Sequence, residues 1–145
     1  MGCSVSENFK SFQFFAEWCN KQIGFKNKGW HLDKDILLRG NKVYSEDNCV
    51  FVPHEVNTAF LSCTVNRGEY PVGSSLHKKT GKLSVKVRLG NRSEYLGLFS
   101  TREGAFLAYK QAKESYIVEL ANKFINDVDR RVYEALINWR VRIDD

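Results

Sequence analysis

Lysine and arginine alternate with apolar residues in one stretch of the sequence, and this pattern is the clearest sign of chemistry in the chain. Lys86 and Arg88 stand between Val85, Val87 and Leu89. Because the side chains of a β-strand alternate between its two faces, this spacing predicts a strand with one basic and one apolar face. Lysine and arginine on a small sheet can reach base acceptors and phosphates in the major groove of DNA. The alternative is a solvated face whose charges only keep the protein in solution.

A second group of reactive side chains lies between residues 31 and 35. His31 and Asp33 are two residues apart, which places them on the same face of a strand. Asp33 and Asp35 form a carboxylate pair, or they are exposed acids that pair with Lys34 or Lys42. Lys34 is not expected to accept a proton, because lysine has a pKa of about 10.4 and neighbouring carboxylates favour its cation. His31 is either a reactive imidazole beside Asp33 or an ordinary half-exposed residue.

The elements that hold this second group are short. Apolar residues at helical spacing predict a helix over residues 9–23. Two strands are predicted over residues 30–38 and 49–52, with a turn between them. Pro53 is favoured in the first turn of a helix, and the helix predicted there runs to residue 60.

The basic strand belongs to a predicted three-stranded antiparallel sheet, because turn residues separate it from two further strand-like segments. The three strands cover residues 72–78, 83–89 and 93–99. A capping box from Ser100 to Glu103 then starts a long helix, whose apolar stripe can pack on the apolar face of the sheet. A short helix that includes Val132, Leu136 and Trp139, and a terminal strand over residues 140–143, complete the chain.

The predicted fold class is α+β. An N-terminal helix and a ββα module precede the three-stranded sheet packed on its long helix, and a short helix follows. The predicted domain boundaries are a first module over residues 1–61, a linker over 62–69, a second module over 70–126, and a C-terminal helix and tail over 127–145.

The net charge of +5, from 22 basic and 17 acidic residues, is confined to one segment of the 145-residue chain. Residues 1–69 and 100–145 are each neutral, and residues 70–99 hold six basic residues against Glu94 alone. A basic segment favours an anionic partner such as nucleic acid. The sequence thus places an anion-binding surface on the predicted sheet.

Membrane insertion and secretion are not expected. No apolar run approaches the roughly 20 residues of a membrane span, and no basic segment followed by an apolar one opens the chain. The predicted location is therefore the cytoplasm. The four cysteines lack a C-x-x-C pair, which favours reduced thiols, and a zinc site from Cys49 and His54 is not expected.

The second module carries a recognisable pattern of motifs. It contains Tyr70-Pro-Val-Gly-Ser-Ser-Leu-His-Lys-Lys-Thr-Gly-Lys, then Leu83-Ser-Val-Lys-Val-Arg, Tyr95-Leu-Gly-Leu-Phe and Glu103-Gly-Ala-Phe-Leu-Ala-Tyr. This pattern resembles the APETALA-two type, integrase-like DNA-binding domain, in which the strands of the sheet lie in the major groove. The resemblance implies that the chain binds double-stranded DNA. The DNA-binding residues expected on this surface are Ser75, His77, Lys79, Lys82, Lys86, Arg88 and Tyr95.

The first module carries a second resemblance. It contains Leu32-Asp-Lys-Asp-Ile, then Gly40-Asn-Lys-Val-Tyr-Ser-Glu-Asp-Asn-Cys-Val-Phe-Val-Pro and Val56-Asn57. These segments are similar to phage proteins that join an HNH-like homing endonuclease module to an APETALA-two type domain. The resemblance implies a clamp around one divalent metal ion, with Asp33 and Asn57 at the metal positions and Asn48 at a loop-ordering position. Lys34 stands where HNH enzymes carry their catalytic histidine.

Two functions remain open for this module. In the first, Mg²⁺ held by Asp33 and Asn57 supports phosphodiester hydrolysis, Asn48 supports the loop, and His31 or Lys34 lies near the scissile phosphate. Lys34 would then stabilise charge rather than abstract a proton. In the second, the HNH-like scaffold has lost its chemistry and serves DNA binding or regulation.

A third interpretation concerns a host protein as partner. Four aromatic residues of the first predicted helix could grip such a protein, or they could belong to the hydrophobic core. They are Phe12, Phe14, Phe15 and Trp18.

Overall fold

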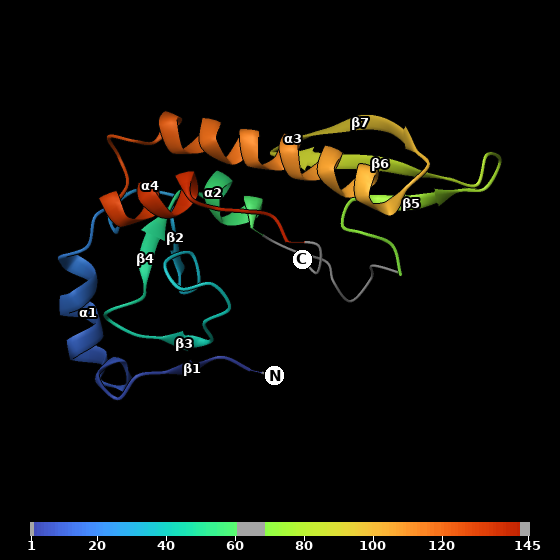
Figure 1. Ribbon diagram of the computed structural model, residues 1–145. Coiled ribbons are helices and arrows are strands. Elements are labelled where there is room, and N and C mark those ends of the chain that lie inside the picture. The colour runs from blue at the N-terminus through green and yellow to red at the C-terminus, as the bar shows by residue number, and fades with distance from the viewer. Residues whose placement is uncertain (1, 61–68, 143–145) are drawn as a thin grey trace. The chain divides into compact units, whose positions relative to one another are not determined.

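The computed structural model describes residues 2–60 and 69–142 and has a mixed α+β fold (Figure 1), as the sequence predicts. The chain divides into two compact units, which are described separately below. Unit 1 comprises Met1–Asn57 and Leu120–Asn138, and unit 2 comprises Thr58–Glu119 and Trp139–Asp145. This division groups the last turn of the long helix and all of the final helix with the N-terminal unit, unlike the boundaries predicted at residues 126 and 127. The predicted linker lies outside the described residues, apart from its last residue.

Unit 1 is built from short elements. β1 (Ser4–Val5) pairs in parallel with β3 (Val43–Tyr44), and β2 (His31–Asp33) pairs antiparallel with β4 (Val50–Val52). The helices are η1 (Asn8–Lys10, a 3₁₀ turn), α1 (Phe12–Asn20), α2 (His54–Ala59) and α4 (Arg130–Ile137). The predicted order of helix, two strands and helix is confirmed, whereas the pairing of β1 with β3 was not predicted, because two-residue strands carry almost no periodicity.

The predicted helix over residues 9–23 is shorter and interrupted. Ser11 is extended, and its hydroxyl accepts a hydrogen bond from the backbone N–H of Phe14 at 3.3 Å, so it caps α1 and separates it from η1. Beyond the helix, Gly24 has φ +90°, and a Cβ at this position would lie 2.2 Å from a ring carbon of Trp30. Only glycine suits this turn, because both the backbone angle and the neighbouring ring exclude a side chain.

The predicted strand over residues 30–38 is wrong beyond Asp33. The carboxylate Oδ2 of Asp33 accepts the backbone N–H of Asp35 at 3.0 Å and that of Ile36 at 2.7 Å. These two bonds turn the chain out of the strand at once, which is the usual competition between aspartate side chains and regular structure. β2 therefore ends at Asp33 and not at the predicted residue 38.

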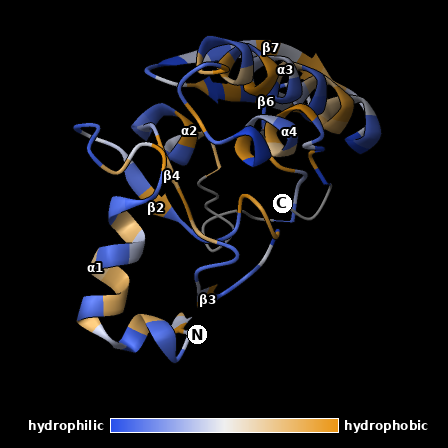
Figure 2. Ribbon diagram, turned by 90° about the vertical axis from the view of Figure 1, so that its left-hand side faces the viewer, coloured by the Kyte–Doolittle hydropathy of each residue, from blue (hydrophilic) through white to orange (hydrophobic). Residues whose placement is uncertain are grey.

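Aromatic rings form the core beneath α1. Phe9 is 8% exposed, and its ring centroid lies 6.3, 5.0 and 4.9 Å from those of Phe14, Phe15 and Trp18. All three residues of β4 are buried, and the strand is hydrophobic along its length in Figure 2. Three of the four aromatic residues considered as a partner surface therefore belong to internal packing. Phe12 does not, because it is 84% exposed.

Unit 2 contains the predicted antiparallel sheet. Its strands are β5 (Ser74–His77), β6 (Lys82–Leu89) and β7 (Arg92–Phe99), in the order β5-β6-β7. They agree with the predicted ranges to within two residues. Gly81 and Gly90, both with φ +70°, occupy the two turns.

The long helix α3 (Arg102–Lys123) covers the apolar face of the sheet (Figure 1). Ala105 is fully buried against Leu83 and Val85, and Tyr109 packs on the same cluster. Gly73 makes room for this ring, since a Cβ there would lie 2.2 Å from Tyr109 Cδ2. The apolar stripe predicted for the helix is thus the contact that joins helix to sheet.

The cap of α3 is one residue later than predicted. The hydroxyl of Thr101, not that of Ser100, accepts the backbone N–H of Gly104 at 3.0 Å. The helix begins at Arg102, so Thr101 is its N-cap and Gly104 is the third helical residue, which is the usual spacing for this bond.

Replacing Thr101 with alanine is expected to lower the free energy of unfolding by about 1 kcal/mol, because one backbone N–H at the start of α3 loses its partner. Thermal unfolding followed by circular dichroism measures the effect. Ser100→Ala serves as the matched control and should leave the stability within about 0.5 kcal/mol. Equal losses in both variants would show that the cap assignment is wrong.

The C-terminal helix α4 is confirmed. Asp129 caps it by accepting the backbone N–H of Arg131 at 2.9 Å, and Val132 and Leu136 are its buried residues. Trp139 follows the helix rather than belonging to it. The predicted terminal strand is wrong for residues 140–142, which are not in a strand, and its last residue, 143, lies outside the described part. None of the helices in the described ranges has the length and apolar character that crossing a membrane requires.

Candidate functional site

The open face of the sheet collects basic and polar side chains from all three strands. On β6, Leu83, Val85, Val87 and Leu89 are buried, and the residues that alternate with them point to the opposite face. Directly opposed residues of antiparallel strands share a face, so the register defines the rest of this surface. It consists of Ser75 and His77 on β5, Lys82, Ser84, Lys86 and Arg88 on β6, and Ser93, Tyr95 and Leu98 on β7. We call this set the basic face.

A β-bulge determines whether Tyr95 belongs to the basic face. Counting by twos from Phe99, which packs in the core, places Tyr95 on the covered side. The register shifts between Val85 and Lys86, so that Tyr95 opposes Lys86 while Gly97 opposes Val85. Gly97 has φ +120°, a backbone angle that glycine adopts without strain. The extra residue turns Tyr95 outward, where it is 58% exposed.

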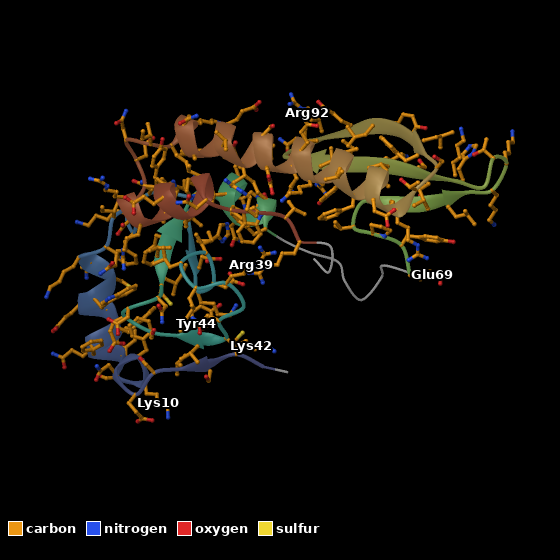
Figure 3. All side chains as sticks on the ribbon, viewed as in Figure 1. Lys10, Arg39, Lys42, Tyr44, Glu69 and Arg92 are labelled. Atoms are coloured by element: carbon orange, nitrogen blue, oxygen red, sulfur yellow. The ribbon has the colours of Figure 1, made fainter. Side chains whose placement is uncertain are left out.

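No acidic residue lies on the basic face. Glu94, the acid of this segment, opposes Val87 and therefore belongs to the covered side of the sheet. Glu94 forms an ion pair at 3.6 Å with Arg92. Arg92, the first residue of β7, is labelled in Figure 3. Within the described ranges, Lys82, Lys86 and Arg88 form no ion pair, so the charges of the basic face are not neutralised by the protein itself.

The positive field of Arg88 reaches the helix behind the sheet. Lys113 on α3 donates to the backbone carbonyl of Arg88 at 3.4 Å. Burial, and after it the charge of Arg88, lower the pKa of Lys113 from its ordinary value. Burial is the main cause of the lowered pKa, and the charge of Arg88 adds a smaller repulsion that an anion bound on the basic face would reduce.

Lys79 lies outside the basic face proper. It is exposed in the β5–β6 turn, beside Lys78. His77, the last residue of β5, is bonded to this turn through a hydrogen bond of 2.8 Å between its Nδ1 and Thr80 Oγ1. The turn extends the positive surface beyond the end of the strands, so six of the seven predicted DNA-binding residues lie on the face and one at its rim.

In unit 1, the imidazole of His31 contacts that of His54, the first residue of α2. His31 Nε2 lies 3.0 Å from His54 Nδ1, and the two ring centroids are 5.1 Å apart. Both side chains are exposed. The register explains the contact, because His31 opposes Val52 and only Pro53 separates Val52 from His54. The sequence predicts this contact between the two histidines only when the residue-by-residue pairing of β2 with β4 is known.

Asp33 points inward. It is 9% exposed, and one of its carboxylate oxygens already holds the turn over residues 33–36. Burial raises the pKa of Asp33 above its ordinary value, and the charge of Asp35 adds to the rise, while the backbone hydrogen bonds from Ile36 and Asp35 oppose it. His31 and Asp33 therefore share a face of β2, but the imidazole of His31 is exposed and the carboxylate of Asp33 is buried.

Lys34 stays cationic. Its Nζ lies 4.0 Å from Asp35 Oδ2 and 5.7 Å from the ring centre of Tyr44, which Figure 3 labels on β3. Burial acts to lower the pKa of Lys34, but the neighbouring acidic groups, Asp35 first among them, outweigh it and hold the pKa above its ordinary value. A lysine in this state cannot serve as a general base at neutral pH.

The two asparagines occupy different surroundings. Asn48 lies in the turn before β4, where its Nδ2 donates to Ser45 Oγ at 3.4 Å and its backbone N–H donates to the Ser45 carbonyl. Asn57 lies on α2, one helical turn after His54, and is half-buried. Asn48 thus orders the 45–48 turn.

Compared with models of protein families, with curated proteins and with solved structures, the chain matches none of them.

Proposed function

We propose that this chain binds double-stranded DNA with its basic face. The observation that carries the proposal is the exposed row of Lys82, Lys86 and Arg88 on β6, with no acidic residue opposite any of them. Polar side chains on both flanking strands, including Ser75 and Tyr95, widen the row into a surface. The proposal includes the cytoplasm as the place of action, where a phage genome would be accessible.

The composition of this surface suits a duplex. Lysine and arginine bind phosphates and the acceptor edge of guanine, and serine, histidine and tyrosine add hydrogen bonds to phosphate or base edges. A major groove about 12 Å wide admits a two-stranded ribbon, and β6 with β7 presents Lys86, Arg88 and Tyr95 on neighbouring strands.

Fluorescence anisotropy with a short labelled duplex tests this function directly. We expect binding at low salt that weakens linearly on a plot of log affinity against log salt, because bound phosphates release counterions. Binding to a single strand of the same sequence should be weaker, since its backbone does not offer a groove. Absence of binding to the duplex at low salt would refute the proposal.

Cleavage of DNA is the finer question. A carboxylate and an amide oxygen suit a hard cation such as Mg²⁺, but Asp33 is buried and one of its oxygens already holds two backbone N–H groups. No group of three or more His, Cys, Asp or Glu side chains that could hold a metal ion occurs among the residues the structure describes. Because one oxygen of Asp33 is already engaged in this way, Asp33 and Asn57 fit a magnesium ion poorly.

The favoured form of the proposal is therefore binding without cleavage. We expect supercoiled plasmid incubated with excess protein and Mg²⁺ or Mn²⁺ to remain intact on an agarose gel, while the same mixture shows retarded migration before protein is removed. Magnesium binding by Asp33 and Asn57 stays a prediction of the nuclease alternative. Metal-dependent nicking that disappears in Asp33→Asn would establish that alternative instead.

A further inference from the structure

The contact between His31 and His54 is unusual for two exposed side chains. His31 Nε2 and His54 Nδ1 are 3.0 Å apart. A solvated imidazole has water as a partner for both of its nitrogens, so nothing in hydrogen bonding alone requires the two rings to meet. Their meeting follows from the backbone, because the β2–β4 ladder and the buried Pro53 fix both Cα positions.

The spacing of the two nitrogens matches that of two ligands on one metal ion. Imidazole nitrogens bound at about 2.0–2.1 Å lie roughly 2.9 Å apart at a right angle and roughly 3.4 Å apart at the tetrahedral angle. The separation of 3.0 Å between His31 and His54 falls within this range. A metal ion bound by both nitrogens would take the place of the shared proton, and each ring would turn so that its lone pair points at the ion and not along the line between the two nitrogens.

We propose that His31 and His54 together form a binding site for a divalent transition metal ion, of which Zn²⁺ is the representative. Two neutral imidazoles favour Zn²⁺, Ni²⁺ and Cu²⁺ and have little affinity for Mg²⁺. The site differs from the magnesium positions that the HNH resemblance implies, because its donors are nitrogens on residues 31 and 54 rather than oxygens on residues 33 and 57. The proposal of this metal site also does not depend on the proposal that the basic face binds DNA.

The site is open. The described residues supply no third histidine, cysteine or carboxylate in the same cluster, so His31 and His54 would hold the ion and water would complete its coordination. Open positions of this kind can accept an oxygen of a phosphate or carboxylate. Two protein ligands also give a weaker and more rapidly exchanging site than the four of a structural zinc site.

The test is a titration of the protein with ZnCl₂, with MgCl₂ as the comparison, followed by NMR of the imidazole nitrogens. We expect the His31 Nε2 and His54 Nδ1 signals to shift together with one midpoint, and the signals of His77 to stay in place. This measurement uses the unaltered rings, so it does not depend on whether a variant folds. A shift of His77 equal to theirs, or no shift of either of the pair, would overturn the proposal.

Isothermal titration calorimetry of variants provides the second readout. His31→Ala and His54→Ala should each weaken zinc binding at least tenfold, and His77→Ala, which removes the remaining histidine of the chain, should leave it unchanged. All proteins carry Cys3→Ser and Cys63→Ser, because thiolates bind zinc as well. Unaltered affinity in both of the first two variants would refute the site.

Discussion

Replacing Lys86 and Arg88 together with alanine is expected to lower the affinity for duplex DNA by roughly 30-fold or more, which corresponds to about 2 kcal/mol. Both side chains are exposed on β6 and point to the same face. Removing them leaves the covered side of the sheet untouched, because Val85, Val87 and Leu89 supply that packing. The loss should therefore appear in binding and not in the unfolding temperature.

The salt dependence of binding distinguishes phosphate contacts from contacts to bases. Each phosphate contact contributes a slope of about −0.9 on the plot of log affinity against log salt. If both residues bind phosphates, the slope of the double variant becomes shallower by roughly 1.8. If Arg88 binds a base edge, the slope changes by only about half as much, and discrimination between duplex sequences decreases.

A variant with the same change in net charge serves as the control. Lys26 and Lys28 are exposed in unit 1, outside the basic face, and replacing both with alanine also removes two positive charges. This control should reduce affinity much less than the Lys86/Arg88 variant. Equal losses in the two proteins would mean that net charge, and not the basic face, drives binding.

The second large effect concerns stability. Asp33→Ala is expected to lower the free energy of unfolding by about 2–3 kcal/mol, because the N–H groups of Asp35 and Ile36 lose their acceptor in a buried turn. Asp35→Ala is the matched control. The side chain of Asp35 is 43% exposed and lies 4.0 Å from Lys34, so its loss should change stability by no more than about 0.5 kcal/mol. Urea denaturation measures both variants, and similar values for the two would contradict the role assigned to Asp33.

The dependence on pH follows from the raised pKa of Asp33. A carboxyl whose pKa is higher in the folded state binds protons more tightly there than in the unfolded chain. Its contribution to stability therefore increases as the pH falls from above the raised pKa towards the ordinary value for aspartate, and it decreases as the pH rises through the same window.

Asp33→Asn isolates this contribution. Asparagine keeps an acceptor for the two N–H groups and cannot ionise, so the stability of Asp33→Asn relative to the wild type should be greatest near neutral pH and should shrink on acidification. The difference between the two proteins removes the effects of other acids, such as Asp129, whose pKa is lowered chiefly by a hydrogen bond from Arg131. A difference that grows on acidification would show that the pKa of Asp33 is lowered rather than raised.

Sequence patterns predicted the second unit well because its information is local and repeated. Alternation with period two along β6 is set by the geometry of a strand, and the charges that it presents can be counted directly from the sequence. The stripe that includes Ala105 and Tyr109 likewise follows from helical spacing and predicts the packing of α3 on the sheet. The location of the basic face therefore follows from the spacing of charged and apolar residues along one segment.

The structure of the first unit was harder to predict, because it depends on contacts that leave no periodic pattern in the sequence. The inward turn of Asp33 rests on two hydrogen bonds to the residues that follow it, which end a strand that the hydrophobic pattern would continue. Each local hydrogen bond of this kind stabilises the turn by about 1 kcal/mol, so local bonding competes with the pairing of strands. The amino-acid composition does not determine whether the turn or the continued strand is the more stable.

The sequence by itself determined the fold class, the three strands of the sheet and the place of its positive charge, because each depends on spacing along one segment. Tertiary structure decided the orientation of Tyr95 and the meeting of His31 with His54. The first depends on a bulge that shifts one strand against its neighbour, and the second on pairing between β2 and β4. Both depend on how separate segments of the chain align with one another, and the spacing of residues within a single segment does not specify that alignment.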